Sequence, residues 1–63
     1  MGKYDKQIER SKQMLAEAQK KYDEAVIKLA DASPGVRETV LGTYGRQIEE
    51  AKSMIATFEG AND

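Results

Sequence analysis

The hydrophobic positions in the first half of the chain repeat with alternating spacings of four and three residues. Such a spacing places the side chains in one stripe along an α-helix, and it is the seam pattern of a coiled coil. We therefore predict a helix over residues 3–31. Its stripe is formed by Tyr4, Ile8, Ser11, Leu15, Ala18, Tyr22, Ala25 and Leu29.

A second stripe follows a restart signal at Ser33-Pro34. Serine is a favoured N-cap residue and proline is favoured at the first helical position, so the pair predicts a turn at residues 32–33 and a new helix after it. Gly60 is well placed to end that helix, which gives the range 34–59. Two helices of nearly equal length with so short a connection form an antiparallel hairpin. The second stripe consists of Leu41, Tyr44, Ile48, Ala51, Ile55 and Phe58.

Two glycines three residues apart lie inside the second predicted helix, in the sequence LGTYGR at residues 41–46. Each costs a helix interior about 0.5–1 kcal/mol relative to alanine. Folding the hairpin about its turn sets Tyr22 opposite Tyr44, and Gly42 and Gly45 would let a ring or a second backbone approach closely. The alternative is a break at Gly42 that starts a third helix at Tyr44. The unbroken stripe favours one continuous helix.

The two halves of the chain also resemble each other. Residues 4–16 align with residues 44–56 without gaps, and seven of the thirteen positions are identical. Either the chain contains an internal repeat, or two amphipathic helices of similar composition look alike by chance. In both cases Tyr44 takes the stripe position that Tyr4 has in the first helix.

Several apolar side chains lie outside the two stripes. A hairpin of this length buries one seam, and that burial is small beside the entropy cost of ordering the chain. Ile27 lies more than about 90° from the stripe of its helix, where the hairpin itself cannot cover it. We predict a single all-α domain over residues 1–63 that self-associates, as a symmetric dimer forming a four-helix bundle or as a higher oligomer. The side chains concerned are Met14, Val26, Ile27, Val36, Val40 and Met54.

Composition limits the chemistry that the chain can carry. It has no cysteine and no histidine, which removes thiolates, the commonest general base and the commonest transition-metal ligand. The adjacent carboxylates of Glu49 and Glu50 point about 100° apart on a helix and are poorly placed to share a proton. We therefore expect no enzyme activity, no metal and no cofactor. No apolar run approaches the roughly 20 residues of a membrane span, so we also expect no membrane association and a cytoplasmic protein.

Cationic side chains gather toward the turn half of the predicted hairpin, beside two tyrosines. Ammonium and guanidinium groups form charge-assisted hydrogen bonds with phosphates, and tyrosine rings stack on planar bases. A small anionic ligand with a planar ring would suit this set. The alternative is that the tyrosines fill the seam and the lysines only solvate the outer faces. The candidate ligand-binding residues are Lys20, Lys21, Tyr22, Tyr44 and Arg46, with Lys28 and Arg37 nearby.

About half of the chain resembles a known family. The resemblance is carried by the sequences LADASPGVRET at residues 29–39, IEEA at residues 48–51 and MIA at residues 54–56. These segments look like the hairpin of small phage anti-CBASS proteins. The resemblance implies an oligomeric helical sponge that sequesters a cyclic-nucleotide immune signal without cleaving it. It carries over no individual binding residue.

Two other functions fit the same pattern. A coiled-coil adaptor or assembly module would dock a partner helix on the apolar side chains that lie outside the two stripes. An RNA-binding four-helix bundle would share the architecture, although a net charge of −1 makes the binding of long nucleic acid unexpected. Our first hypothesis is a non-catalytic homo-oligomer that sequesters an anionic nucleotide signal.

Overall fold

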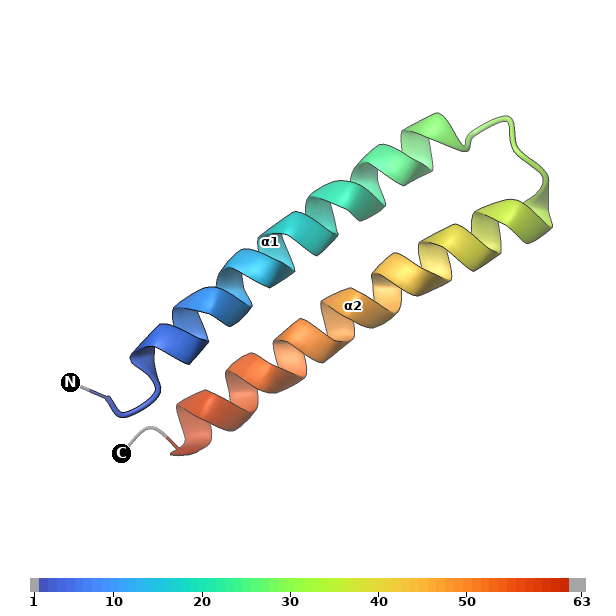
Figure 1. Ribbon diagram of the computed structural model, residues 1–63. Coiled ribbons are helices and arrows are strands. Elements are labelled where there is room, and N and C mark those ends of the chain that lie inside the picture. Colours follow the sequence, from blue (N-terminus) through green and yellow to red (C-terminus); the bar gives the residue numbers. More distant parts are fainter. Residues whose placement is uncertain (1, 62–63) are drawn as a thin grey trace.

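The structure, a computed structural model that describes residues 2–61, is an antiparallel hairpin of two α-helices (Figure 1). Helix α1 (Asp5–Lys28) and helix α2 (Pro34–Ala61) are joined by a loop at residues 29–33. The hairpin is long and thin, with principal extents of 47 × 15 × 9 Å. The predicted all-α class is confirmed. Residues 1 and 62–63 of the predicted domain lie outside the described range.

Helix α1 is shorter at both ends than the predicted range 3–31. It begins after Tyr4, which is its N-cap residue. Beyond its other end, the N–H of Ala32 donates to the carbonyl of Leu29 at 3.0 Å, a bond between residues three apart. Such bonds tighten the chain into turns. Residues 29–31 therefore turn toward α2 instead of extending the helix.

Helix α2 begins at the predicted residue, Pro34, and is continuous through the LGTYGR segment. The N–H of Arg37 donates to the carbonyl of Ser33 at 3.0 Å, which is the first bond of the helical ladder. There is no third helix in the described chain. Gly60, where the sequence pattern predicts the end of the helix, lies inside its last turn without a positive φ.

The seam between the helices is built largely from small side chains. Ser11 and Ala51 are each only 1% exposed, whereas the larger stripe residues Leu15, Tyr22 and Tyr44 are half-buried. Small seam residues let two helix backbones approach closely, because no long side chain separates them. The hairpin therefore has a thin core, which consists of Ile8, Ser11, Ala18, Ala25, Ile48 and Ala51.

Neither glycine of the LGTYGR segment is required for close packing inside the hairpin. A Cβ atom built on Gly42 would have no heavy atom within 4 Å, and one built on Gly45 would lie 4.0 Å from Cε2 of Tyr22. The second distance is an ordinary van der Waals contact. The hypothesis that both glycines clear space around Tyr22 and Tyr44 is therefore wrong for Gly42 within the hairpin, and Gly45 has room for a methyl group.

One side-chain nitrogen in the described chain is buried without a partner. This atom is Nε of Arg37, in the first turns of α2. An unpaired buried donor costs about 1–3 kcal/mol. We expect Arg37→Met, which keeps an unbranched side chain and removes the donor, to raise the free energy of unfolding by about 1 kcal/mol.

Urea unfolding followed by circular dichroism would measure this difference. Arg46→Met makes the same change at an exposed position of the same helix, and we expect it to alter the stability by less than about 0.5 kcal/mol. A loss of stability in Arg37→Met alone would show that the guanidinium contributes more than its unpaired Nε costs.

Candidate functional site

An open groove lies between the two helices in the half of the hairpin next to the loop. Its volume is ≈ 220 Å³, and we call it the turn groove. Both helices contribute apolar side chains to it, and three ionisable side chains of α1 stand along one edge. The residues that line it are Lys21, Glu24, Ala25, Lys28, Leu29, Val40 and Tyr44.

Helical spacing and the antiparallel register together build the turn groove. Lys21, Glu24 and Lys28 are three and four residues apart, which places them on one face of α1. Tyr44 comes from α2 and is half-buried, while the three charged side chains are exposed. The groove thus offers two ammonium groups with a carboxylate between them, beside an aromatic ring. An anionic group on the rim and a planar ring against Tyr44 would both find a matching side chain.

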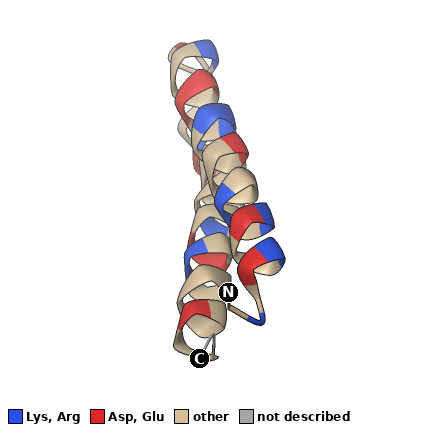
Figure 2. Cartoon of the chain, turned by 90° about the vertical axis from the view of Figure 1, so that its left-hand side faces the viewer, with Lys and Arg blue, Asp and Glu red and all other residues tan. Residues whose placement is uncertain are grey.

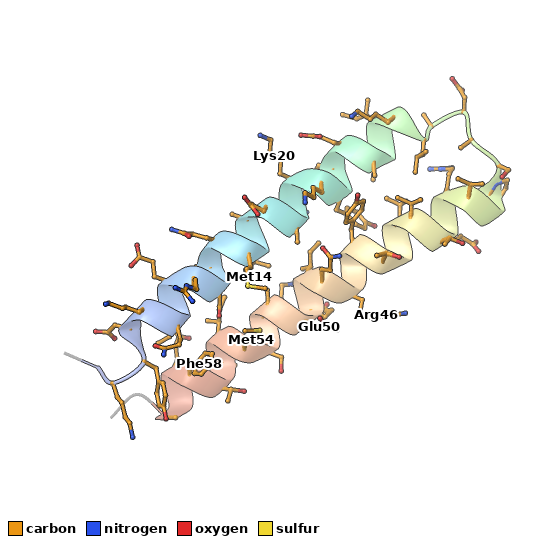
Figure 3. The ribbon with its side chains drawn as sticks, in the orientation of Figure 1. Met14, Lys20, Arg46, Glu50, Met54 and Phe58 are labelled. Atoms are coloured by element: carbon orange, nitrogen blue, oxygen red, sulfur yellow. The ribbon has the colours of Figure 1, made fainter. Side chains whose placement is uncertain are left out.

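Two of the five predicted ligand-binding residues, Lys21 and Tyr44, line the turn groove. Lys20 and Arg46 are exposed and point away from the hairpin on opposite sides (Figure 3). These two cations cannot reach a ligand in the turn groove of the same chain.

Tyr22, the fifth predicted residue, is half-buried in the seam of α1. Its ring lies 4.0 Å from the position that a Cβ atom on Gly45 would occupy, so it packs against the backbone of α2. Tyr22 does not line the turn groove. The five predicted residues therefore do not form one site within a single chain.

The turn groove also contains residues that the sequence prediction did not include. Glu24 and Val40 are among them, and Lys28 entered the prediction only as a neighbour. The sequence does indicate Lys28, because Lys21 and Lys28 are one heptad apart and share a face of the helix. Val40 could not be found in this way, since its place in the groove depends on how α2 is rotated about its own axis.

A second groove, of ≈ 190 Å³, lies toward the open end of the hairpin. Met14 of α1 and Met54 of α2 line it, and the two side chains lie close together between the helices (Figure 3). Lys21 borders both grooves, so they are neighbours along one side of the molecule. We call this second one the methionine groove. Its lining is completed by Glu17, Ala18, Lys21, Gln47 and Glu50.

Charged residues of both signs are distributed along both helices (Figure 2). Within residues 2–61, no group of three or more His, Cys, Asp or Glu side chains is placed to hold a metal ion. Neither of the two described helices combines the length and the apolar character that crossing a membrane requires.

No protein-family model matches this chain, and comparisons with curated proteins and with solved structures give no significant match either. The two grooves and the chemistry of their side chains are the features that indicate a function.

Proposed function

We propose that this chain is a non-catalytic binding protein that acts as a homo-oligomer and sequesters a small anionic ligand of the nucleotide type. The turn groove is the binding site in this proposal. The observation that carries it is the placement of Lys21 and Lys28 on the rim beside the ring of Tyr44. A phosphate would bind the ammonium group of Lys21 or of Lys28 on the side away from the carboxylate of Glu24, and a base would stack on the tyrosine.

The size of the turn groove limits how the ligand binds. Pockets that enclose drug-sized ligands measure about 300–1,000 Å³, and the turn groove has ≈ 220 Å³. One chain therefore holds one ring and an adjoining phosphate, and the remainder of a larger ligand stays outside. In this proposal the site binds its ligand and releases it unchanged.

The sequence resemblance to phage anti-CBASS sponges favours a nucleotide signal among the possible anions. A cyclic nucleotide combines phosphates and planar bases, which are the two features that the turn groove can recognise. Positive and negative side chains are interspersed along the hairpin in Figure 2, which is unfavourable for binding a long nucleic acid. A long nucleic acid is held mainly by a continuous run of cations.

The first experiment asks whether a nucleotide accompanies the purified protein. The protein is purified without added nucleotide and denatured, and the supernatant is analysed by absorbance near 260 nm and by mass spectrometry. We then titrate the protein with mononucleotides and cyclic dinucleotides by calorimetry. A nucleotide in the supernatant that binds again in the titration supports the proposal, and failure of both measurements contradicts it.

Removing the two rim charges should weaken nucleotide binding. We expect Lys21→Gln together with Lys28→Gln to raise the Kd at least about tenfold, equivalent to about 1.4 kcal/mol, because the charge-assisted bond to the phosphate is lost whichever lysine makes it. The control is Lys12→Gln together with Lys20→Gln. It makes the same change in net charge at exposed positions of α1 outside the turn groove, and we expect less than about a twofold effect.

An equal loss of affinity in both double variants would show that only the overall charge matters. A steep dependence of binding on salt, with a preference for longer strands, would favour an RNA-binding bundle instead.

A protein-binding adaptor is the second candidate function. Its support is Ile27, which is 77% exposed on α1 and lines neither groove. A partner helix could cover this side chain together with its neighbours. The adaptor predicts that Ile27→Glu abolishes the partner contact while nucleotide binding, if any, stays unchanged.

A further inference from the structure

The methionine groove presents two large apolar side chains together, one from each helix. Met14 is 50% exposed and Met54 is 38% exposed, and the buried residue Ala18 lies between Met14 and Lys21 along α1. The thioether side chain is flexible and fits irregular partner surfaces. A contiguous apolar patch with a polar rim is typical of an interaction surface.

The accessible surface area of the hairpin is larger than that of a compact monomer of the same mass. Its accessible area is 4898 Å², while a compact monomer of 7.0 kDa exposes about 4,000 Å². Its radius of gyration is 14.5 Å, against about 11 Å for a compact chain of this length. The excess of about 900 Å² is close to the roughly 800 Å² that each partner buries in a stable interface. A partner of similar size that covers one broad face of the hairpin would bury this excess area.

The rim of the methionine groove suits a second copy of the same chain. A two-fold contact brings a surface patch against itself, so a rim of one charge sign would repel its copy. This rim carries Glu17 and Glu50 as well as Lys21, and Gln47 adds an amide. A rim that carries both signs therefore avoids this repulsion.

The internal similarity of the chain adds a second argument for symmetry. Met14 and Met54 occupy equivalent positions in the aligned segments 4–16 and 44–56. In the antiparallel hairpin these two equivalent residues line one groove. The groove thus presents the same side chain from both helices, and it can pack against a copy of itself with each methionine facing a methionine.

We propose that a second copy of this chain covers the methionine groove about a two-fold axis that passes close to Met14 and Met54, forming a four-helix bundle. This inference rests on the self-association included in the proposed function and assigns a face to it. Ile27 lies off that face, about 140° from Met14 around α1, and stays exposed in the dimer. Lys21 borders both grooves and is left unchanged in the tests that follow.

Single cysteines test which face is buried, because the chain contains no cysteine of its own. A disulfide forms only when the two Cα atoms come within about 7 Å, which a residue beside a two-fold axis satisfies. Met14→Cys and Met54→Cys are compared with Ile27→Cys at micromolar concentration under a mild oxidant. We expect at least one of the methionine positions to form covalent dimers at least about tenfold faster than position 27. Equal rates at all three positions would overturn the proposed face.

Sedimentation equilibrium of the unmodified chain and of charge variants gives the second test. We expect the unmodified protein to be a dimer at micromolar concentration. Met14→Glu together with Met54→Glu should raise the dissociation constant at least about a hundredfold, while Ile27→Glu changes it by less than about twofold. Circular dichroism shows whether the double variant stays helical. If it unfolds, the cysteine rates decide.

The remaining outcomes distinguish the two proposals. A monomeric wild-type protein removes the self-association from both, whereas an oligomer that dissociates in Ile27→Glu only overturns the dimer through the methionine groove alone. A dimer with the expected cysteine rates that binds no nucleotide keeps this inference and removes the ligand proposed for the turn groove.

Discussion

Replacing Ala51 by leucine is expected to lower the free energy of unfolding by about 1–3 kcal/mol. Ala51 is 1% exposed in α2, and the equally covered Ser11 belongs to the facing seam of α1. The larger side chain cannot turn to solvent from this position, so the two helices have to move apart. That movement weakens contacts along the whole seam. A small domain with only a few kcal/mol of net stability would lose a large part of it.

Ala56→Leu provides the matched control for this prediction. It makes the same substitution in the same helix, at an exposed position five residues further on. Alanine and leucine have similar helix propensities, so we expect a change of less than about 0.5 kcal/mol. Urea unfolding followed by circular dichroism measures both variants. If they are equally stable, the small residues of the seam do not hold the helices close together.

The two stripes could be predicted from the sequence because they depend only on the spacing of apolar residues along a helix. Ser11 shows the strength of this argument, since a serine was placed in a hydrophobic stripe by its position alone and is 1% exposed. The end of α1 could not be predicted in the same way. The heptad pattern continues to Leu29, but the chain has to cross to the second helix before Pro34 and uses residues 29–31 for that turn.

The candidate site could be predicted only in part, because residues that are adjacent in the sequence point in different directions around a helix. Lys20 is adjacent to Lys21 and therefore points about 100° away from it. Arg46 follows Tyr44 by two residues, which is about 200° around α2. Both were included for their position along the chain, whereas Lys28 is one heptad from Lys21 and lines the same groove.

Changing both glycines of the LGTYGR segment to alanine is expected to raise the free energy of unfolding by about 1–2 kcal/mol, which is about 0.5–1 kcal/mol for each position. This part of α2 is rich in residues with low helix propensity. The hydroxyl of Thr39 donates to the carbonyl of Gly35 at 2.9 Å, and that of Thr43 donates to the carbonyl of Thr39 at 3.0 Å. Alanine at positions 42 and 45 loses less backbone entropy than glycine when this part of the helix forms. A Cβ atom would meet no heavy atom within 4 Å at Gly42 and only Cε2 of Tyr22, at 4.0 Å, at Gly45, so no overpacking opposes this gain.

Thermal unfolding of Gly42→Ala, Gly45→Ala and the double variant measures the gain, and sedimentation equilibrium and calorimetric titration with cyclic dinucleotides are run on the same samples. Gly60→Ala, in the last turn of α2, is the control and should change little because helix ends fray. A destabilised Gly42→Ala would contradict the open space found beside this residue. A double variant that is more stable but assembles or binds nucleotide more weakly would show that the glycines are needed for a contact outside the hairpin. In that case a second copy or a ligand approaches the backbone of α2 where the hairpin itself leaves it uncovered.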